Sequence, residues 1–180
     1  MKLAYQIPNK LYWIHDFLDY NMYKGIYTAI IKERDKINLS TTKGFWEDNL
    51  HKNIRAPKRV QVSDYKPFEN LKTLVTHNQY LQLKPADYQN EMTTTIHYME
   101  RGAGIQWHSD TKWTYGITYY LNKNWSSDWG GEFMFADKVS HGFFPVVANS
   151  LAVVKSPFAH KVNPVLSPIM PRMSIQIFMR

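Results

Sequence analysis

The chain has 180 residues, of which 44% are hydrophobic and 15% aromatic, and this composition excludes a disordered or low-complexity protein. The absence of cysteine excludes a disulfide framework, an iron–sulfur cluster and a cysteine nucleophile, so any metal must be held by His, Asp or Glu. The formal charge of +7 would suit an acidic partner, but the lysines and arginines are dispersed, which favours a solvated basic surface over a nucleic-acid interface. No apolar run is long enough for a signal peptide or a spanning helix, so we expect a cytoplasmic protein without a membrane partner, folded as one domain over residues 1–180.

The N-terminal half is expected to be mostly helical or irregular. Apolar residues recur at three- and four-residue spacing in segment 15–34, which predicts an amphipathic helix that begins after Asp19. Residues 38–65 mix turn formers with isolated aromatics and follow no period, which predicts irregular structure. A second, short helix is expected within residues 68–83. Residues 1–90 would then support the remainder of the domain.

Residues 91–180 have the pattern of an antiparallel β-structure. Runs of β-branched and aromatic residues alternate with Gly, Asn, Asp, Ser or Pro turns. The runs are "EMTTTIHYME", "GIQWHSD", "WTYGITYYLN", "GGEFMFA", "FFPVVANSLAVVKS" and "RMSIQIFMR". Short strands at this spacing predict a mainly β (α+β) protein with a sandwich, barrel or jelly-roll core, on one sheet of which the N-terminal helices pack.

A histidine and an aspartate in this β region have the spacing of metal ligands. Residues i and i+2 of a strand point to the same face, so His108 and Asp110 can reach one metal ion. A mononuclear site needs a third protein ligand, and His160 is the best candidate because it follows a β run; His97 and His141 remain alternatives. Two histidines and one carboxylate leave three positions open, which is the arrangement of non-haem Fe(II) oxygenases.

Further motifs follow this pair in an order that resembles a known family. They are "YYLNKNW" (119–125), "GGEFMF" (130–135), "HKVNPV" (160–165) and an R-x-S formed by Arg172 and Ser174. With the H-x-D, this order resembles the Fe(II)- and 2-oxoglutarate-dependent dioxygenases, particularly the prolyl 4-hydroxylase-like branch, over roughly residues 95–180.

The resemblance implies a fold, a cofactor set and a reaction. The core would be a double-stranded β-helix, a form of jelly roll, with His108, Asp110 and His160 as iron ligands. The cofactors would be Fe(II), 2-oxoglutarate and O2, with ascorbate as a further candidate. Oxidative decarboxylation of 2-oxoglutarate to succinate and CO2 would be coupled to hydroxylation of a C–H bond, and the protein would supply geometry and exclude water.

The resemblance also implies where the co-substrate binds. The far carboxylate of 2-oxoglutarate needs a cation in its pocket, and the planar fork of Arg172 can bind it in bidentate fashion. Ser174 alternates onto the same strand face as Arg172. Tyr120 corresponds to a family position that hydrogen-bonds the same carboxylate, and Tyr98 has the spacing of a family tyrosine that lines the pocket.

The substrate side is less defined. Trp107, Trp113 and Tyr115 surround the iron motif and are candidates for the wall of the substrate pocket. A prolyl residue of a peptide or protein is the first expected substrate. The alternatives are a free amino acid, another small molecule or an alkylated base with the same cofactor chemistry, and a non-catalytic metal-binding jelly-roll module.

Overall fold

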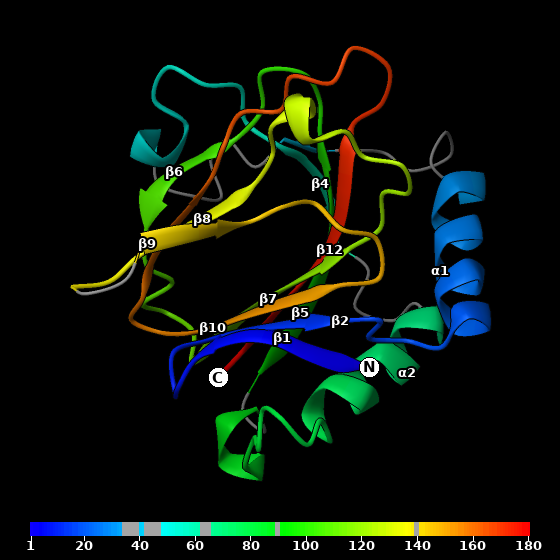
Figure 1. Cartoon of the computed structure of the whole chain (residues 1–180), viewed down its shortest axis with the longest axis vertical. Helices are drawn as coiled ribbons and strands as arrows, with labels where there is room; N and C mark the ends of the chain where they lie inside the picture. The colour runs from blue at the N-terminus through cyan, green and yellow to red at the C-terminus, as the bar shows by residue number, and fades with distance from the viewer. Residues whose placement is uncertain (34–39, 42–47, 62–65, 89–90, 139–140) are drawn as a thin grey trace.

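The computed structural model describes residues 1–33, 40–41, 48–61, 66–88, 91–138 and 141–180, and it has two antiparallel β-sheets (Figure 1). The larger sheet has the strand order β1-β2-β10-β7-β12-β5-β4-β3, and the smaller sheet has the order β6-β11-β8-β9. The strands are β1 (Lys2–Ile7), β2 (Leu11–His15), β3 (Ser40–Thr41), β4 (Lys58–Gln61), β5 (Met92–Met99), β6 (Ile105–His108), β7 (Tyr115–Tyr120), β8 (Phe133–Ala136), β9 (His141–Phe144), β10 (Leu151–Lys155), β11 (Ala159–Val162) and β12 (Arg172–Met179). Short 3-10 helices span Asp48–His51, Pro85–Asp87 and Ser127–Trp129.

Two α-helices, α1 (Tyr20–Glu33) and α2 (Lys66–Thr76), lie on one side of the larger sheet (Figure 1). The side-chain Oδ1 of Asp19 accepts hydrogen bonds from the backbone N–H groups of Asn21 and Met22, which caps the N-terminus of α1. Both predicted helices are confirmed, and α2 begins two residues before the expected segment. Neither helix is long and apolar enough to cross a membrane.

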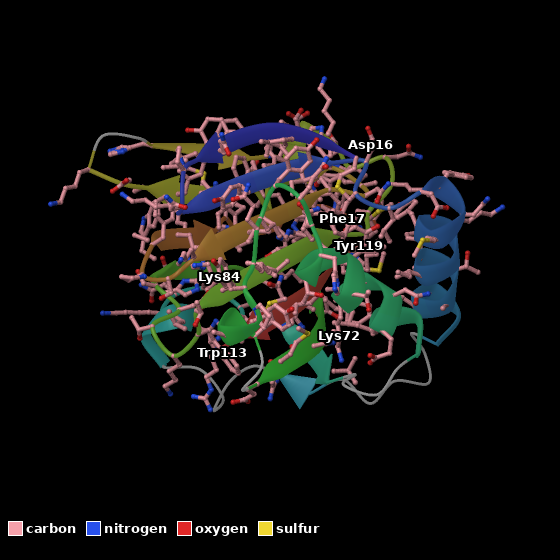
Figure 2. The ribbon with its side chains drawn as sticks, turned by 90° about the horizontal axis from the view of Figure 1, so that it is seen from below. Asp16, Phe17, Lys72, Lys84, Trp113 and Tyr119 are labelled. Atoms are coloured by element: carbon pink, nitrogen blue, oxygen red, sulfur yellow. The ribbon has the colours of Figure 1, made fainter. Side chains whose placement is uncertain are left out.

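The two faces of the larger sheet have different roles. On β12, Ile175 and Ile177 are fully buried in the apolar cluster that α1 and α2 share with the sheet. Phe17 and Tyr119 meet in the same cluster, with ring centroids 6.2 Å apart (Figure 2). Side chains alternate along a strand, so the intervening β12 residues, Gln176 among them, face the smaller sheet and the cavities between the sheets. The core therefore fixes which residues reach the functional site.

The N-terminal half departs from the prediction because it supplies strands to the larger sheet. β1 and β2 form a hairpin, β2 pairs with β10, and β4 pairs with β5. β2 is buried on both faces, so its sequence lacks the polar alternation that marks a half-exposed strand. The expected irregular region 38–65 contains β3 and β4, and residues 38–39, 42–47 and 62–65 of it lie outside the described part of the chain.

Candidate metal centre

Three predicted metal ligands converge between the sheets. His108 at the end of β6 is the register partner of His160 in β11, and Asp110 follows β6 by two residues. The Nε2 atom of His108 lies 3.6 Å from Oδ1 of Asp110, and Nε2 of His160 lies 3.3 Å from Oδ2 of the same carboxylate. Within the described residues, this is the only group of at least three His, Asp or Glu side chains close enough to share one metal ion.

The backbone fixes the tautomer of both histidines. Nδ1 of His108 lies 2.8 Å from the carbonyl oxygen of Gln106, and Nδ1 of His160 lies 2.9 Å from that of Phe158. A carbonyl oxygen can only accept, so each Nδ1 carries the hydrogen and donates it. The lone pairs of both Nε2 atoms therefore point at the centre, as metal-binding histidines require.

The protonation states also suit a cation. Burial lowers the pKa of His108, and the nearby His160 lowers it further. Burial alone would raise the pKa of Asp110, but the adjacent imidazoles of His160 and His108 lower it by more, so the pKa lies below its ordinary value. Near pH 7 the group consists of neutral His108 and a carboxylate, and this N,N,O donor set fits Fe(II).

A glycine makes room for the carboxylate. A Cβ on Gly116 of β7 would lie 2.7 Å from Oδ2 of Asp110, which is closer than a side chain allows. The sequence did not single out Gly116, because its contact with Asp110 depends on how a separate strand is placed and not on a local motif.

The alternative third ligands do not join the group. His141 is exposed in β9, at the edge of the smaller sheet. His97 of β5 lines the cavities beside the metal ligands. Burial, with the charges of Arg172 and Arg59, lowers the pKa of His97 to about 3. His97 is therefore a neutral wall of the site at physiological pH.

Two adjoining cavities meet at the metal ligands. The smaller, of about 30 Å³, lies over Gly116, Thr118 and Gln176 on the inner face of the larger sheet. The larger, of about 460 Å³, extends from the metal ligands toward Arg59 and Trp113. Because His108, Asp110, His97 and Phe178 line both, a group in either cavity would lie beside the same metal ion.

A buried arginine lies at the start of β12. Arg172 is fully buried, and its guanidinium carbon is 4.9 Å from the ring centroid of Tyr120. Its Nη1 lies 3.3 Å from Oγ of Ser174, whereas Nε and Nη2 have no hydrogen-bond partner among the described residues. Burial lowers the pKa of Arg172 below its ordinary value, and Tyr120 opposes that shift. A buried cation with unsatisfied donors is a site for an anion.

Two of the three predicted companions of Arg172 lie beside it. Ser174 is the register partner of Tyr120 across β12 and β7, and the buried Tyr120 hydroxyl has no hydrogen-bond partner among the described residues. Tyr98 lies on the other face of β5, where it pairs with Met173 and packs in the helix-facing cluster. The structure thus brings Ser174 and Tyr120 to the arginine but not Tyr98.

Of the three candidate wall residues, one lines a cavity beside the predicted metal ligands. Trp113 lines the larger cavity, and its ring centroid lies 5.6 Å from that of Phe178. Figure 2 shows Trp113 at a distance from α1. Trp107 is 47% exposed and lies under the ammonium of Lys161. Tyr115 is buried in the helix-facing cluster. Strand alternation explains both displacements, since Trp107 and Tyr115 are next to the inward-facing His108 and Gly116.

A facing pair of antiparallel sheets that encloses two histidines, a carboxylate and a buried arginine defines a jelly-roll protein with a mononuclear metal site. Residues 93–180, which include all of these side chains, match the family model described as "2OG-Fe(II) oxygenase superfamily". This part of the chain therefore has the sequence of a 2-oxoglutarate-dependent dioxygenase, a class whose cofactors are Fe(II), 2-oxoglutarate and O2, and its two histidines and one carboxylate fit the iron.

Solved structures confirm the fold. A Trichoplax adhaerens prolyl hydroxylase in complex with a hypoxia inducible factor peptide fragment has a TM-score of 0.77 and 19% identity, over 96% of this chain and 84% of that one. A Pseudomonas putida prolyl-4-hydroxylase has a TM-score of 0.72 and 17% identity, over 95% and 92%. The collagen prolyl hydroxylase of Paramecium Bursaria Chlorella virus-1, in its 2OG complex, has a TM-score of 0.65 and 13% identity, over 95% and 97%. No curated protein sequence matches the chain.

Proposed function

We propose that the chain hydroxylates a prolyl C–H bond of a peptide or protein, and that His108, Asp110 and His160 hold the Fe(II). The observation that carries this proposal is the convergence of the three side chains, with both Nε2 atoms and the carboxylate turned to one point. When bound there, Fe(II) and 2-oxoglutarate supply the oxidation of the C–H bond, with release of succinate and CO2.

The far carboxylate of 2-oxoglutarate is assigned to Arg172. The guanidinium offers Nε and Nη2, which have no hydrogen-bond partner among the described residues. The guanidinium also lies against the ring of Tyr120, whose hydroxyl is a further donor. A charge-assisted pair in a buried site is stronger than one in water. The carboxylate would therefore be oriented at its far end by Arg172, which leaves the 2-oxo acid end for the metal.

The substrate is assigned to the larger cavity. Its volume of about 460 Å³ suits a side chain or a small ligand, and it opens directly on His108 and Asp110. Trp113 and Phe178 provide an aromatic wall on which a pyrrolidine ring can pack. The prolyl hydroxylase neighbours, one of which holds a peptide fragment, support a peptide substrate.

A small polar substrate is the second candidate. The same cavity carries several hydroxyl groups together with the cationic Arg59 and Lys112. Such a wall would also suit the carboxylate of a free amino acid. The hydroxylated product identifies the substrate class.

The test is iron-dependent release of succinate from 2-oxoglutarate, followed by mass spectrometry for the gain of one oxygen atom across proline-containing peptides and free amino acids. We expect His108→Ala to abolish succinate release and His141→Ala, an exposed histidine outside the group, to leave it intact. Succinate release that does not depend on iron, or that survives in His108→Ala, would contradict the assignment of the ligands.

A further inference from the structure

A chain of hydrogen bonds runs along the cavity face of β12, from Arg172 toward the metal ligands. Nη1 of Arg172 and Nε2 of Gln176 lie 3.3 Å and 3.2 Å from the same atom, Oγ of Ser174. Oε1 of Gln176 lies 2.8 Å from Oγ1 of Thr118, its register partner on β7. Gln176 and Thr118 also line the smaller cavity with His108. These hydrogen bonds therefore connect Arg172 with the residues that line the cavity at the metal centre.

The chemistry of these groups sets the direction of the Ser174 hydroxyl. A guanidinium and an amide NH2 can only donate, and a hydroxyl has two lone pairs and one hydrogen. The two donors, Arg172 and Gln176, thus occupy both lone pairs of Ser174. The remaining hydrogen of Ser174 must then point away from both donors, toward a third group that can accept it.

We propose that Gln176, with its amide oriented by Thr118, is a positioning residue for the co-substrate: it turns the Ser174 hydroxyl into a donor for the carboxylate held by Arg172. This inference rests on the proposed co-substrate site. Without the Gln176 donor, one lone pair of Ser174 becomes vacant and its hydrogen is no longer directed. The carboxylate then loses an oriented charge-assisted hydrogen bond.

The decisive comparison uses two 2-oxo acids and protein loaded with Mn(II) in place of Fe(II). 2-Oxopentanoate has the chain length of 2-oxoglutarate but lacks the far carboxylate. We expect Gln176→Leu to weaken 2-oxoglutarate binding, measured by calorimetry, by about tenfold. The same variant should change 2-oxopentanoate binding by less than about twofold, because no far carboxylate remains to be lost.

A double-mutant cycle tests whether Gln176 acts through Ser174. Ser174→Ala should weaken 2-oxoglutarate binding by about tenfold, and the additional change Gln176→Leu should then cost no more than about twofold. Thr118→Val, which removes only the orienting hydroxyl, should cause a smaller loss in the same direction, and it decides the question if Gln176→Leu does not fold. Gln6→Leu, on the exposed edge strand β1, is the matched control and should bind as the original protein does.

The outcomes separate this proposal from the proposed function. If the unaltered Mn(II) protein fails to bind 2-oxoglutarate, the co-substrate site itself is wrong. If it binds, but Gln176→Leu weakens both oxo acids equally or neither, the co-substrate site stands and the positioning role of Gln176 is overturned. An undiminished effect of Gln176→Leu in the Ser174→Ala background would also overturn it.

Discussion

Gly116→Ala should separate metal binding from folding. The added Cβ would lie 2.7 Å from Oδ2 of Asp110, about 0.7 Å short of an ordinary contact of 3.4 Å. The obstructed atom is at the end of a rotatable side chain, so the fold can relieve the clash by turning the carboxylate. A metal site tolerates displacements of only about 0.2 Å in its ligand distances, however. The required shift exceeds that tolerance, and we expect metal affinity to fall by about 10- to 100-fold, or ~1.4–2.8 kcal/mol.

The stability of the metal-free protein should be almost unaffected by Gly116→Ala. A glycine within a strand lowers the free energy of unfolding by roughly 0.5–1 kcal/mol relative to alanine. Gly116→Ala therefore gains about as much stability as the turned carboxylate loses. The assay is calorimetric titration of metal-free protein with Mn(II), together with urea unfolding in the presence of chelator. We expect weakened Mn(II) binding and a nearly unchanged unfolding free energy.

Gly25→Ala is the control for this comparison. A Cβ on Gly25 of α1 would meet nothing within 4 Å. The variant should therefore gain up to about 1 kcal/mol of helix stability and bind Mn(II) normally. Unchanged Mn(II) affinity of Gly116→Ala would refute the argument that Asp110 binds the metal in the observed position.

Three other changes probe the walls of the site. His97 has a pKa of about 3 when folded and about 6.5 when unfolded, so the unfolded state takes up the proton first as pH falls, and stability is lost below pH 6.5. Between pH 7 and pH 5 this loss is about 2 kcal/mol. The variant His97→Gln should remove the loss from the urea unfolding curves of the metal-free protein. Gly131→Ala puts a Cβ 2.9 Å from Cδ of Arg172 at a φ of 77°, so we expect about 1–2 kcal/mol lower stability and weaker 2-oxoglutarate binding to the Mn(II) protein; unaltered binding would contradict the role of Arg172. Trp113→Ala should raise KM for the substrate several-fold and leave 2-oxoglutarate affinity unchanged; equal loss of both would argue against a substrate wall.

A local sequence pattern was sufficient to bring together two of the three predicted metal ligands. An i, i+2 pair on an extended segment can reach one point, and that rule predicted the meeting of His108 and Asp110. The same rule would also have excluded Trp107 from the pocket, since it is adjacent to His108 and points to the other side of β6. The misplaced tryptophan was therefore predictable from the sequence. For the third ligand, the place of His160 after a β run made it the best candidate but left His97 and His141 as alternatives.

Features that depend on pairing between distant strands could not be predicted. β2 belongs to the larger sheet because it pairs with β10, which lies more than a hundred residues later in the chain. Gly116 acquires its role only because β7 brings it against Asp110. Tyr98 and Tyr120 are both strand tyrosines, yet register places only Tyr120 beside Arg172. No local period carries this information, because register is decided by which faces become buried together.

Strand β12 links the core to the chemistry through that register. Its helix-facing residues, such as the fully buried Ile175 and Ile177, lock the strand between β5 and β7. A slip of one residue would turn these isoleucines toward the cavity and bury Arg172 and Gln176 against the helices, which apolar packing opposes. The hydrophobic core therefore favours the register in which the polar row of Arg172, Ser174 and Gln176 faces the smaller sheet and not the helices. The proposed co-substrate site is held in place by apolar contacts that lie on the opposite face of the same strand.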